Sequence, residues 1–187
     1  MTYWVPRPDR LFGAFALAGA IAWAQPAQAV PVIDIGAQAG AAVHLVPSGP
    51  AVDLTADVDL RGLLLGAQYW TQMGTGLNYW QAAARYNVSP VPMLTVAPGL
   101  GVVSASGQLG PMGQLTARFS PVLLPVSVEA AAGYAFVGGG NLLPYHAGVK
   151  FSPLPFTALA LKYRGWAGQA TPFAGLAGPE IGIEIGI

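Results

Sequence analysis

From Val32 to the C-terminus, apolar side chains recur at every second position, which is the period of a β-strand. In the last segment, residues 180–187, four isoleucines alternate with glutamate and glycine. Residues 33–45 and 52–61 show the same alternation, with every aspartate of the second stretch on one parity. Each such strand has one apolar face and one polar face, so we expect an all-β fold.

Ten segments carry this pattern, and each is close to the 9–11 residues with which a tilted strand crosses a bilayer. We therefore predict an antiparallel up-and-down transmembrane β-barrel of about ten strands. The predicted strands span residues 32–46, 51–61, 63–72, 78–88, 93–105, 113–120, 125–137, 143–152, 156–167 and 179–187. Pro98 lies inside the fifth segment, where it cannot donate a ladder hydrogen bond. A bulge there is one interpretation, and a barrel of eight strands is the alternative.

The connections between these segments fall into two alternating sets. One set is short and mostly marked by proline, as at 89–92 and 153–155, and the other is mostly glycine-rich, as at 106–112 and 138–142. Outer-membrane barrels have short periplasmic turns and longer outer loops. The short set is therefore assigned to the periplasmic side, together with both ends of the barrel domain.

Composition favours a membrane protein over a soluble one. The chain is 53% hydrophobic and 9% charged, whereas soluble domains contain roughly 25% charged residues. In a secreted β-sandwich, the alternative, the apolar faces would form a core and the charges would face water. The formal net charge is zero and no basic run occurs, which argues against nucleic acid as a partner. The absence of cysteine excludes disulfides and thiolate metal sites.

Residues 1–29 have the three parts of a secretory signal peptide. Arg7 and Arg10 give a positive start, residues 11–24 form an apolar stretch, and Ala27-Gln28-Ala29 is a small-x-small cleavage site. Fourteen apolar residues are too few for a membrane anchor, which needs about 20. We therefore expect export to the outer membrane, with residues 30–187 as the barrel domain.

Charged residues and histidines of the barrel domain lie on the polar parity of their segments or at segment ends. In a membrane barrel this face lines the lumen, where a buried charge must be paired. We expect a network of ion pairs that holds the lumen closed. Its predicted members are Asp34, His44, Asp53, Asp57, Asp59, Arg85, Arg118, Glu129, His146, Lys150, Lys162, Arg164, Glu180 and Glu184.

Hairpin pairing suggests which of these residues meet. The expected register sets His44 opposite Asp53 and Glu129 opposite Lys150, places His146 beside Lys162, and lets Lys162 and Arg164 reach Glu180 and Glu184. Pairing of the first and last strands would also bring Asp34 near Glu184.

Aromatic residues of the apolar parity sort by height along the barrel, as expected for two membrane interfaces. The outer group comprises Tyr69, Trp80, Tyr134, Phe136 and Tyr163, and the periplasmic group comprises Tyr86, Phe119 and Phe151.

His44, Asp53 and Ser48 around one turn give a weak enzymatic hypothesis, a hydrolase at the outer rim, because a general base needs an oriented imidazole. Ser48 is equally expected in a turn for structural reasons. His44 and His146 lie on distant strands without ligand spacing, so we predict no metal site. We assign no catalytic residue and no cofactor.

A leading signal sequence, alternating ten-residue strands, tight inner turns and aromatic belts make residues 30–187 similar to the small bacterial outer-membrane β-barrel proteins, the group that includes OmpA-like membrane domains. The terminal Ile185-Gly186-Ile187 departs from the aromatic ending of many such barrels. The expected function is a structural or accessory barrel of the cell envelope. A narrow pore or small-ligand channel is the second interpretation, and the rim hydrolase is the third. The expected partners are outer-membrane lipid and other envelope proteins.

Overall fold

The computed structural model describes residues 35–170 and 172–187. The predicted signal peptide, residues 1–29, and Asp34 lie outside the described residues. Within the described part, no helix is long and apolar enough to cross a membrane.

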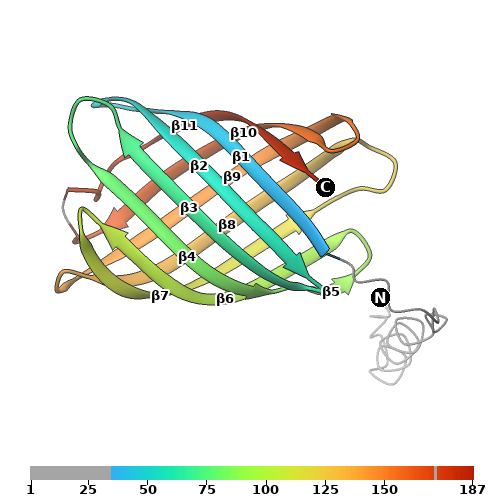
Figure 1. Cartoon of the computed structure of the whole chain (residues 1–187), viewed down its shortest axis with the longest axis horizontal. Coiled ribbons are helices and arrows are strands. Elements are labelled where there is room, and N and C mark those ends of the chain that lie inside the picture. Colours follow the sequence, from blue (N-terminus) through green and yellow to red (C-terminus); the bar gives the residue numbers. More distant parts are fainter. Residues whose placement is uncertain (1–34, 171) are drawn as a thin grey trace, which may run out of the picture. The chain divides into compact units, whose positions relative to one another are not determined.

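Strands make up most of the described chain, and all of them are antiparallel. They are β1 (Ile35–Val46), β2 (Gly49–Leu60), β3 (Leu63–Gln72), β4 (Asn78–Tyr86), β5 (Val88–Val91), β6 (Leu94–Ala105), β7 (Gln108–Phe119), β8 (Val126–Val137), β9 (Gly140–Leu154), β10 (Thr157–Gly168) and β11 (Ala177–Gly186). Consecutive strands pair with each other except β4 and β5, which both pair with β6, and β1 pairs with β11. Because β4 also pairs with β6, the sheet closes into the up-and-down barrel drawn in Figure 1.

The fourth strand of this barrel is interrupted, so the eleven strand segments form ten complete strands of the barrel wall, which we call staves. β4 and β5 are separated by Asn87, and both pair with β6 in the same register before a bulge between Val88 and Val91. The prediction of a ten-stranded antiparallel barrel is confirmed. The eight-stranded alternative is wrong.

Pro98 does not produce a bulge in its own strand. β6 keeps an unbroken register with β7, including the pair Pro98↔Leu115. On its other side the pairing lapses between Arg85↔Gly99 and Val88↔Val96, opposite the break at Asn87. On the side of β3, the amide of Asn87 donates to the carbonyl of Gly62, at 2.7 Å, which continues the β3–β4 register. The break in strand pairing therefore lies in the neighbouring strand, between β4 and β5, and not in the strand that contains Pro98.

Two of the connections assigned to the outer side are shorter than the sequence suggested. β6 and β7 are joined by Ser106 and Gly107 alone, and β8 and β9 by Gly138 and Gly139. All four residues have positive φ angles, the conformation of a two-residue type I′ hairpin turn. The strands therefore continue through the predicted loops 106–112 and 138–142, and the expected contrast between short inner turns and long outer loops is wrong for these connections.

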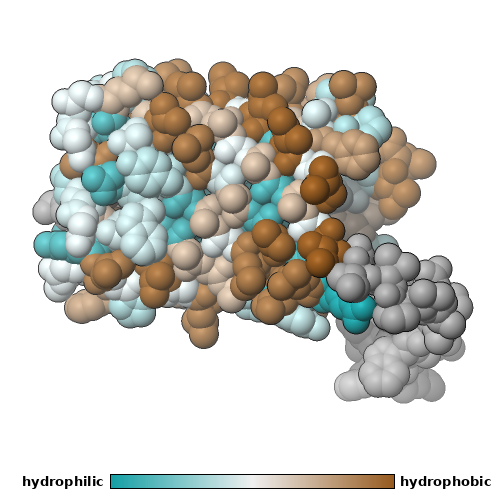
Figure 2. Space-filling model, viewed as in Figure 1, coloured by the Kyte–Doolittle hydropathy of each residue, from teal (hydrophilic) through white to brown (hydrophobic). Residues whose placement is uncertain are grey.

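The two faces of each strand differ as the alternation predicted. In β8, Glu129 is buried in the lumen, whereas Val128 and Tyr134 are 49% and 56% exposed on the outside. In β11, the same contrast separates Glu184 from Ile183. On the face of the barrel drawn in Figure 2, many apolar residues lie at the surface, with polar residues between them. The polar faces of the ten staves are thus brought together in the lumen.

Candidate functional site in the barrel lumen

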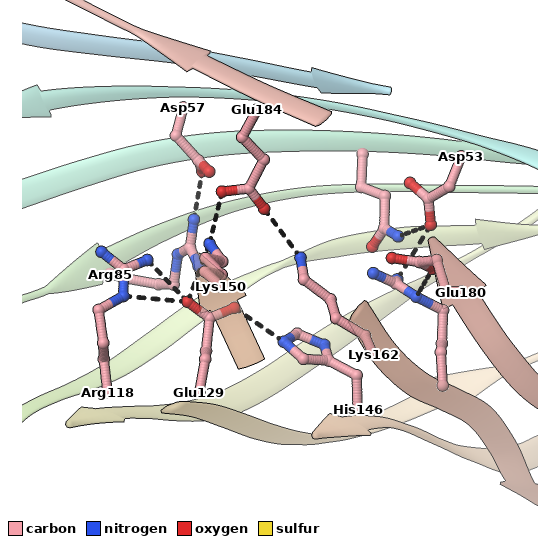
Figure 3. A network of polar contacts seen from close by, with 12 residues as sticks. Asp53, Asp57, Arg85, Arg118, Glu129, His146, Lys150, Lys162, Glu180 and Glu184 are labelled. Atoms are coloured by element: carbon pink, nitrogen blue, oxygen red, sulfur yellow. Dashed lines mark hydrogen bonds and ion pairs between the residues drawn. The ribbon is translucent and has the colours of Figure 1, made fainter. Parts of the chain in front are cut away.

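The middle of the lumen is filled by ion pairs around two glutamates. Glu129 on β8 accepts hydrogen bonds from Arg118 on β7, at 3.1 and 2.7 Å, and lies 3.1 Å from Nε2 of His146. Its carboxylate is also 3.2 Å from Nζ of Lys150. Figure 3 shows Glu129 between Arg118 and His146. Three groups from neighbouring strands thus converge on one carboxylate that is almost fully buried.

Lys150 links this group to the second carboxylate. Its Nζ lies 2.8 Å from Glu184 on β11, and Nζ of Lys162 on β10 lies 3.0 Å from the other oxygen of Glu184. Gln38 on β1 also donates to Glu184. The closing pair of strands, β1 and β11, is therefore bridged by side chains as well as by its backbone ladder.

A third group lies nearer the end that carries the β1–β2 turn. Nε of Arg164 lies 2.7 Å from Glu180, and Nη1 of the same side chain is 3.2 Å from Asp53. Asp53 also accepts a hydrogen bond from Gln68, at 2.5 Å. Asp53 and Glu180 are 1% and 3% exposed, so the arginine provides the compensating charge for both of them.

The remaining charged residues lie toward the end that carries the termini of the barrel. Arg85 on β4 pairs with Asp57 on β2, and the two side chains are 17% and 27% exposed. Asp59 accepts hydrogen bonds from the amide of Gly62, at 2.7 Å, and from the side chain of Asn87, at 3.2 Å. These contacts are more open to solvent than those of Glu129 and Glu184.

A cavity of about 370 Å³ occupies this end of the lumen. Arg85, Arg118, Asp57 and Asp59 line it together with polar and apolar side chains of the wall. Two smaller cavities, of about 60 and 50 Å³, continue inward among the ion pairs. We call the cavity of about 370 Å³ the vestibule.

The opposite end is closed by aromatic side chains, which the sequence analysis did not single out. Trp70 on β3, Tyr79 on β4 and Trp166 on β10 are at most 1% exposed, and Phe173 from the β10–β11 connection is fully buried among them. The ring centroids of Trp70 and Trp166 are 4.9 Å apart, and those of Tyr79 and Trp166 are 5.4 Å apart. We call these four residues the aromatic mouth. The three strand residues lie on the polar parity of their strands, and this placement was the sequence signal that they point into the lumen.

The rim residues of the hydrolase hypothesis do not form a catalytic arrangement. The ladder pairs His44 with Ala51 and Asp53 with Ala42, so the expected His44–Asp53 register is wrong by two residues. Nδ1 of His44 accepts a hydrogen bond from Trp70, at 3.0 Å, and its Nε2 lies 3.2 Å from the carbonyl of Gly178. Ser48 accepts a hydrogen bond from Gln72, at 2.7 Å. Both nitrogens of His44 are therefore engaged by groups other than Asp53 and Ser48.

The other expected pairings hold in part. Lys162 and Arg164 do contact Glu184 and Glu180. Glu129 and Lys150 meet diagonally, because the ladder pairs Glu129 with Gly148 and Lys150 with Ser127. His146 pairs with Arg164 in the ladder, and Lys162 pairs with Gly148. Among the described residues, no group of three or more His, Asp or Glu side chains is arranged as metal ligands.

The aromatic residues expected at membrane interfaces all belong to the outward parity. In the group assigned to the outer side, Tyr69, Tyr134, Phe136 and Tyr163 are 44–56% exposed and Trp80 is half-buried. In the periplasmic group, Tyr86, Phe119 and Phe151 are 43–59% exposed.

Comparisons with known proteins identify the fold. No family model matches the chain, and no curated protein matches its sequence. A solved structure of the KdgM porin is similar with a TM-score of 0.55 and 11% sequence identity, covering 79% of this chain and 98% of that one. A structure of the NanC porin is similar with a TM-score of 0.51 and 10% identity, covering 81% and 99%. At these identities the similarity concerns the β-barrel fold, and it does not support the narrower OmpA-like group.

Proposed function

We propose that this protein is an integral outer-membrane β-barrel with a closed lumen and a structural or accessory role in the cell envelope. The observation that carries the proposal is the filled lumen. The ion pairs of Glu129 and Glu184 occupy its middle, and the aromatic mouth closes one end. An open channel would instead leave a continuous water-filled path.

The outer surface supports residence in a membrane. Its large side chains are apolar, for example Leu161, Ile181 and Ile183, which are 58%, 63% and 54% exposed. An exposed apolar surface of this extent is costly in water and is the surface expected to face lipid. The similarity in fold to two porins agrees with this placement.

Membrane insertion can be tested through the outward face of β8. Ala130 is exposed on the outside, and an arginine near the middle of the bilayer costs about 2–4 kcal/mol. We expect Ala130→Arg to reduce folding into lipid vesicles, measured by the heat-dependent shift in gel mobility. Ser48→Arg, in the exposed β1–β2 turn, serves as the matched control. Full solubility of the folded chain without detergent would contradict membrane residence.

A narrow pore is the second candidate, and the vestibule favours it. This cavity of about 370 Å³ continues into two smaller polar cavities among the ion pairs. If the aromatic mouth opens, the polar cavities would provide a route for small ions. The two candidate functions therefore differ in whether small ions pass through the aromatic mouth.

Single-channel recording in planar bilayers separates the two candidates. A closed barrel gives no steps above the background of protein-free bilayers, and a pore gives discrete steps from the unmodified chain. A porin inserted into the same bilayers is the positive control for the recording. Discrete steps from the unmodified chain would replace the closed-barrel proposal with the pore.

A further inference from the structure

We propose that the aromatic mouth is a binding site for a small molecule carrying a neutral aromatic ring, and that Phe173 occupies this site in the structure. The proposal goes beyond the closed barrel, because it assigns a class of ligand to the aromatic mouth, which the closed-barrel proposal treats only as a seal of the lumen.

Phe173 differs from the rest of the mouth in its origin. Trp70, Tyr79 and Trp166 come from strands of the barrel wall, whereas Phe173 comes from the connection 169–176. Of the described residues in this connection, only Phe173 is buried, with 0% exposure. Its neighbours Pro172 and Gly175 are exposed. The connection thus contributes a single ring to the lumen.

The contacts of this ring are those that a free aromatic molecule could make. Its centroid lies 5.9 Å from Trp70, 6.0 Å from Tyr79 and 5.9 Å from Trp166, with interplanar angles of 59–64°. Tilted and edge-to-face contacts at these distances are the favourable geometry for aromatic pairs. The three wall rings also contact one another through Trp166, so the site does not depend on Phe173 for its shape.

The backbone of the connection is tied to β10 close to Phe173, because the amide of Gly175 donates to the carbonyl of Trp166 and the amide of Trp166 donates to the carbonyl of Leu176, both at 2.9 Å. In residues 172–174, the described backbone hydrogen bonds stay within the connection, from Ala174 to the carbonyl of Ala170 at 3.3 Å and from Leu176 to the carbonyl of Phe173 at 3.0 Å. Gly175, which follows, has a φ of 87°. Phe173 thus lies in a short segment beside this anchor, and removal of its ring leaves the hydrogen bonds to Trp166 in place.

One polar atom at the site specifies the ligand further. Nε1 of Trp166 is buried and has no hydrogen-bond partner among the described residues, whereas Nε1 of Trp70 donates to His44. A buried donor without a partner costs free energy, which a ligand acceptor can recover. Val103 and Leu142 belong to the same buried apolar cluster, and the ring of His44 lies 5.8 Å from that of Trp166. Apolar and aromatic surroundings disfavour a charged ligand. The geometry thus fits a neutral ring with one acceptor, and phenol is a suitable probe.

The first experiment removes the resident ring. Phe173→Ala should leave an apolar cavity, and such cavities bind ring compounds. In detergent, phenol should raise the Tm of Phe173→Ala by a few degrees and saturate, while cyclohexanol, similar in size but not aromatic, should raise it much less. Phe156→Ala is the control, because Phe156 is 69% exposed in the β9–β10 turn. It should show neither effect.

The second experiment keeps Phe173 in place and asks whether a ligand displaces it. The sequence has no cysteine, so Ala174→Cys introduces a single thiol beside the buried ring. Saturating phenol should accelerate maleimide labelling at this position several-fold, and cyclohexanol should not. Leu154→Cys, 64% exposed in β9, should label at the same rate with and without phenol.

Unchanged labelling of Ala174→Cys in phenol would overturn the proposal, even if phenol stabilises Phe173→Ala, because Phe173 would then be a permanent core residue. Labelling also decides the question if Phe173→Ala does not fold. Neither result depends on conductance, so failure of the ligand site leaves the closed-barrel proposal to its own test.

Discussion

At the end of the barrel that carries the β1–β2 and β10–β11 connections, the lumen is filled by buried rings, and Trp70, Trp166 and Phe173 are at most 1% exposed. At the end that carries Ile35 and the C-terminus, the same ten staves enclose a cavity of about 370 Å³. Its ion pairs are partly solvated, as in Arg85 and Asp57, whose side chains are 17% and 27% exposed. One wall therefore supports an apolar, closed end and a polar, open end, and the difference lies in the inward side chains of the strands and in Phe173 of the β10–β11 connection.

This comparison shows why the lumen charges are not equivalent. A charge near the aromatic mouth or in the middle of the lumen has lost its water and depends on its partners. A charge in the vestibule keeps part of its hydration, so the same kind of pair contributes less to stability. Substitutions at the two ends should thus differ in size and in their response to salt.

The largest effect is expected at the mouth. Trp166→Ala removes a side chain that is 1% exposed and contacts four aromatic rings, including that of His44. We expect the free energy of unfolding in detergent to fall by about 4 kcal/mol, the usual cost of removing a buried large aromatic side chain. Trp80→Ala, on the outward face of β4, is the matched control and should cost far less. Equal losses would mean that the mouth is not a packed core.

The sequence predicted the staves and the parity of their charges because both depend on the two-residue period of a strand. It did not predict the hairpin offsets. Ser106-Gly107 and Gly138-Gly139 form turns of two residues, whereas the sequence predicted longer loops at 106–112 and 138–142. His44 and Asp53 were likewise paired two residues out of register. Local turn geometry fixes these offsets, and strand periodicity carries no information about it.

The aromatic mouth was only partly accessible from the sequence. Trp70, Tyr79 and Trp166 stand on the polar parity of their strands, where an aromatic side chain must point into the lumen. Phe173 lies in a connection without any period, so its burial follows from the tertiary fold alone. The break at Asn87 is similar, because it depends on the cross-strand position of Pro98.

The next largest effect is expected in the middle of the lumen. Glu184→Gln leaves Lys150 and Lys162 without their shared carboxylate, and breaking a buried pair on one side costs about 3 kcal/mol. The double change Lys162→Met, Glu184→Leu removes both charges and should destabilise the barrel less than the single change. Thermal unfolding in detergent measures both. If the double variant is less stable than Glu184→Gln, the ion pairs stabilise the barrel by more than they offset the cost of burying their charges.

The smallest effect is expected in the vestibule, where Asp57 pairs with Arg85. Asp57→Asn keeps the shape of the side chain and removes a charge that is partly hydrated, so we expect a loss of about 1 kcal/mol or less. The loss should shrink as the salt concentration rises from 0.05 to 0.5 M (about a threefold decrease in Debye length), because salt screens an exposed pair.

Glu184→Gln, whose partners are less than 10% exposed, is the control and should change little with salt. Denaturant titrations of both variants at the two concentrations provide the measurement. A large, salt-independent loss for Asp57→Asn would mean that the vestibule is as dry as the middle of the lumen, and the contrast between the two ends would then be confined to the aromatic rings.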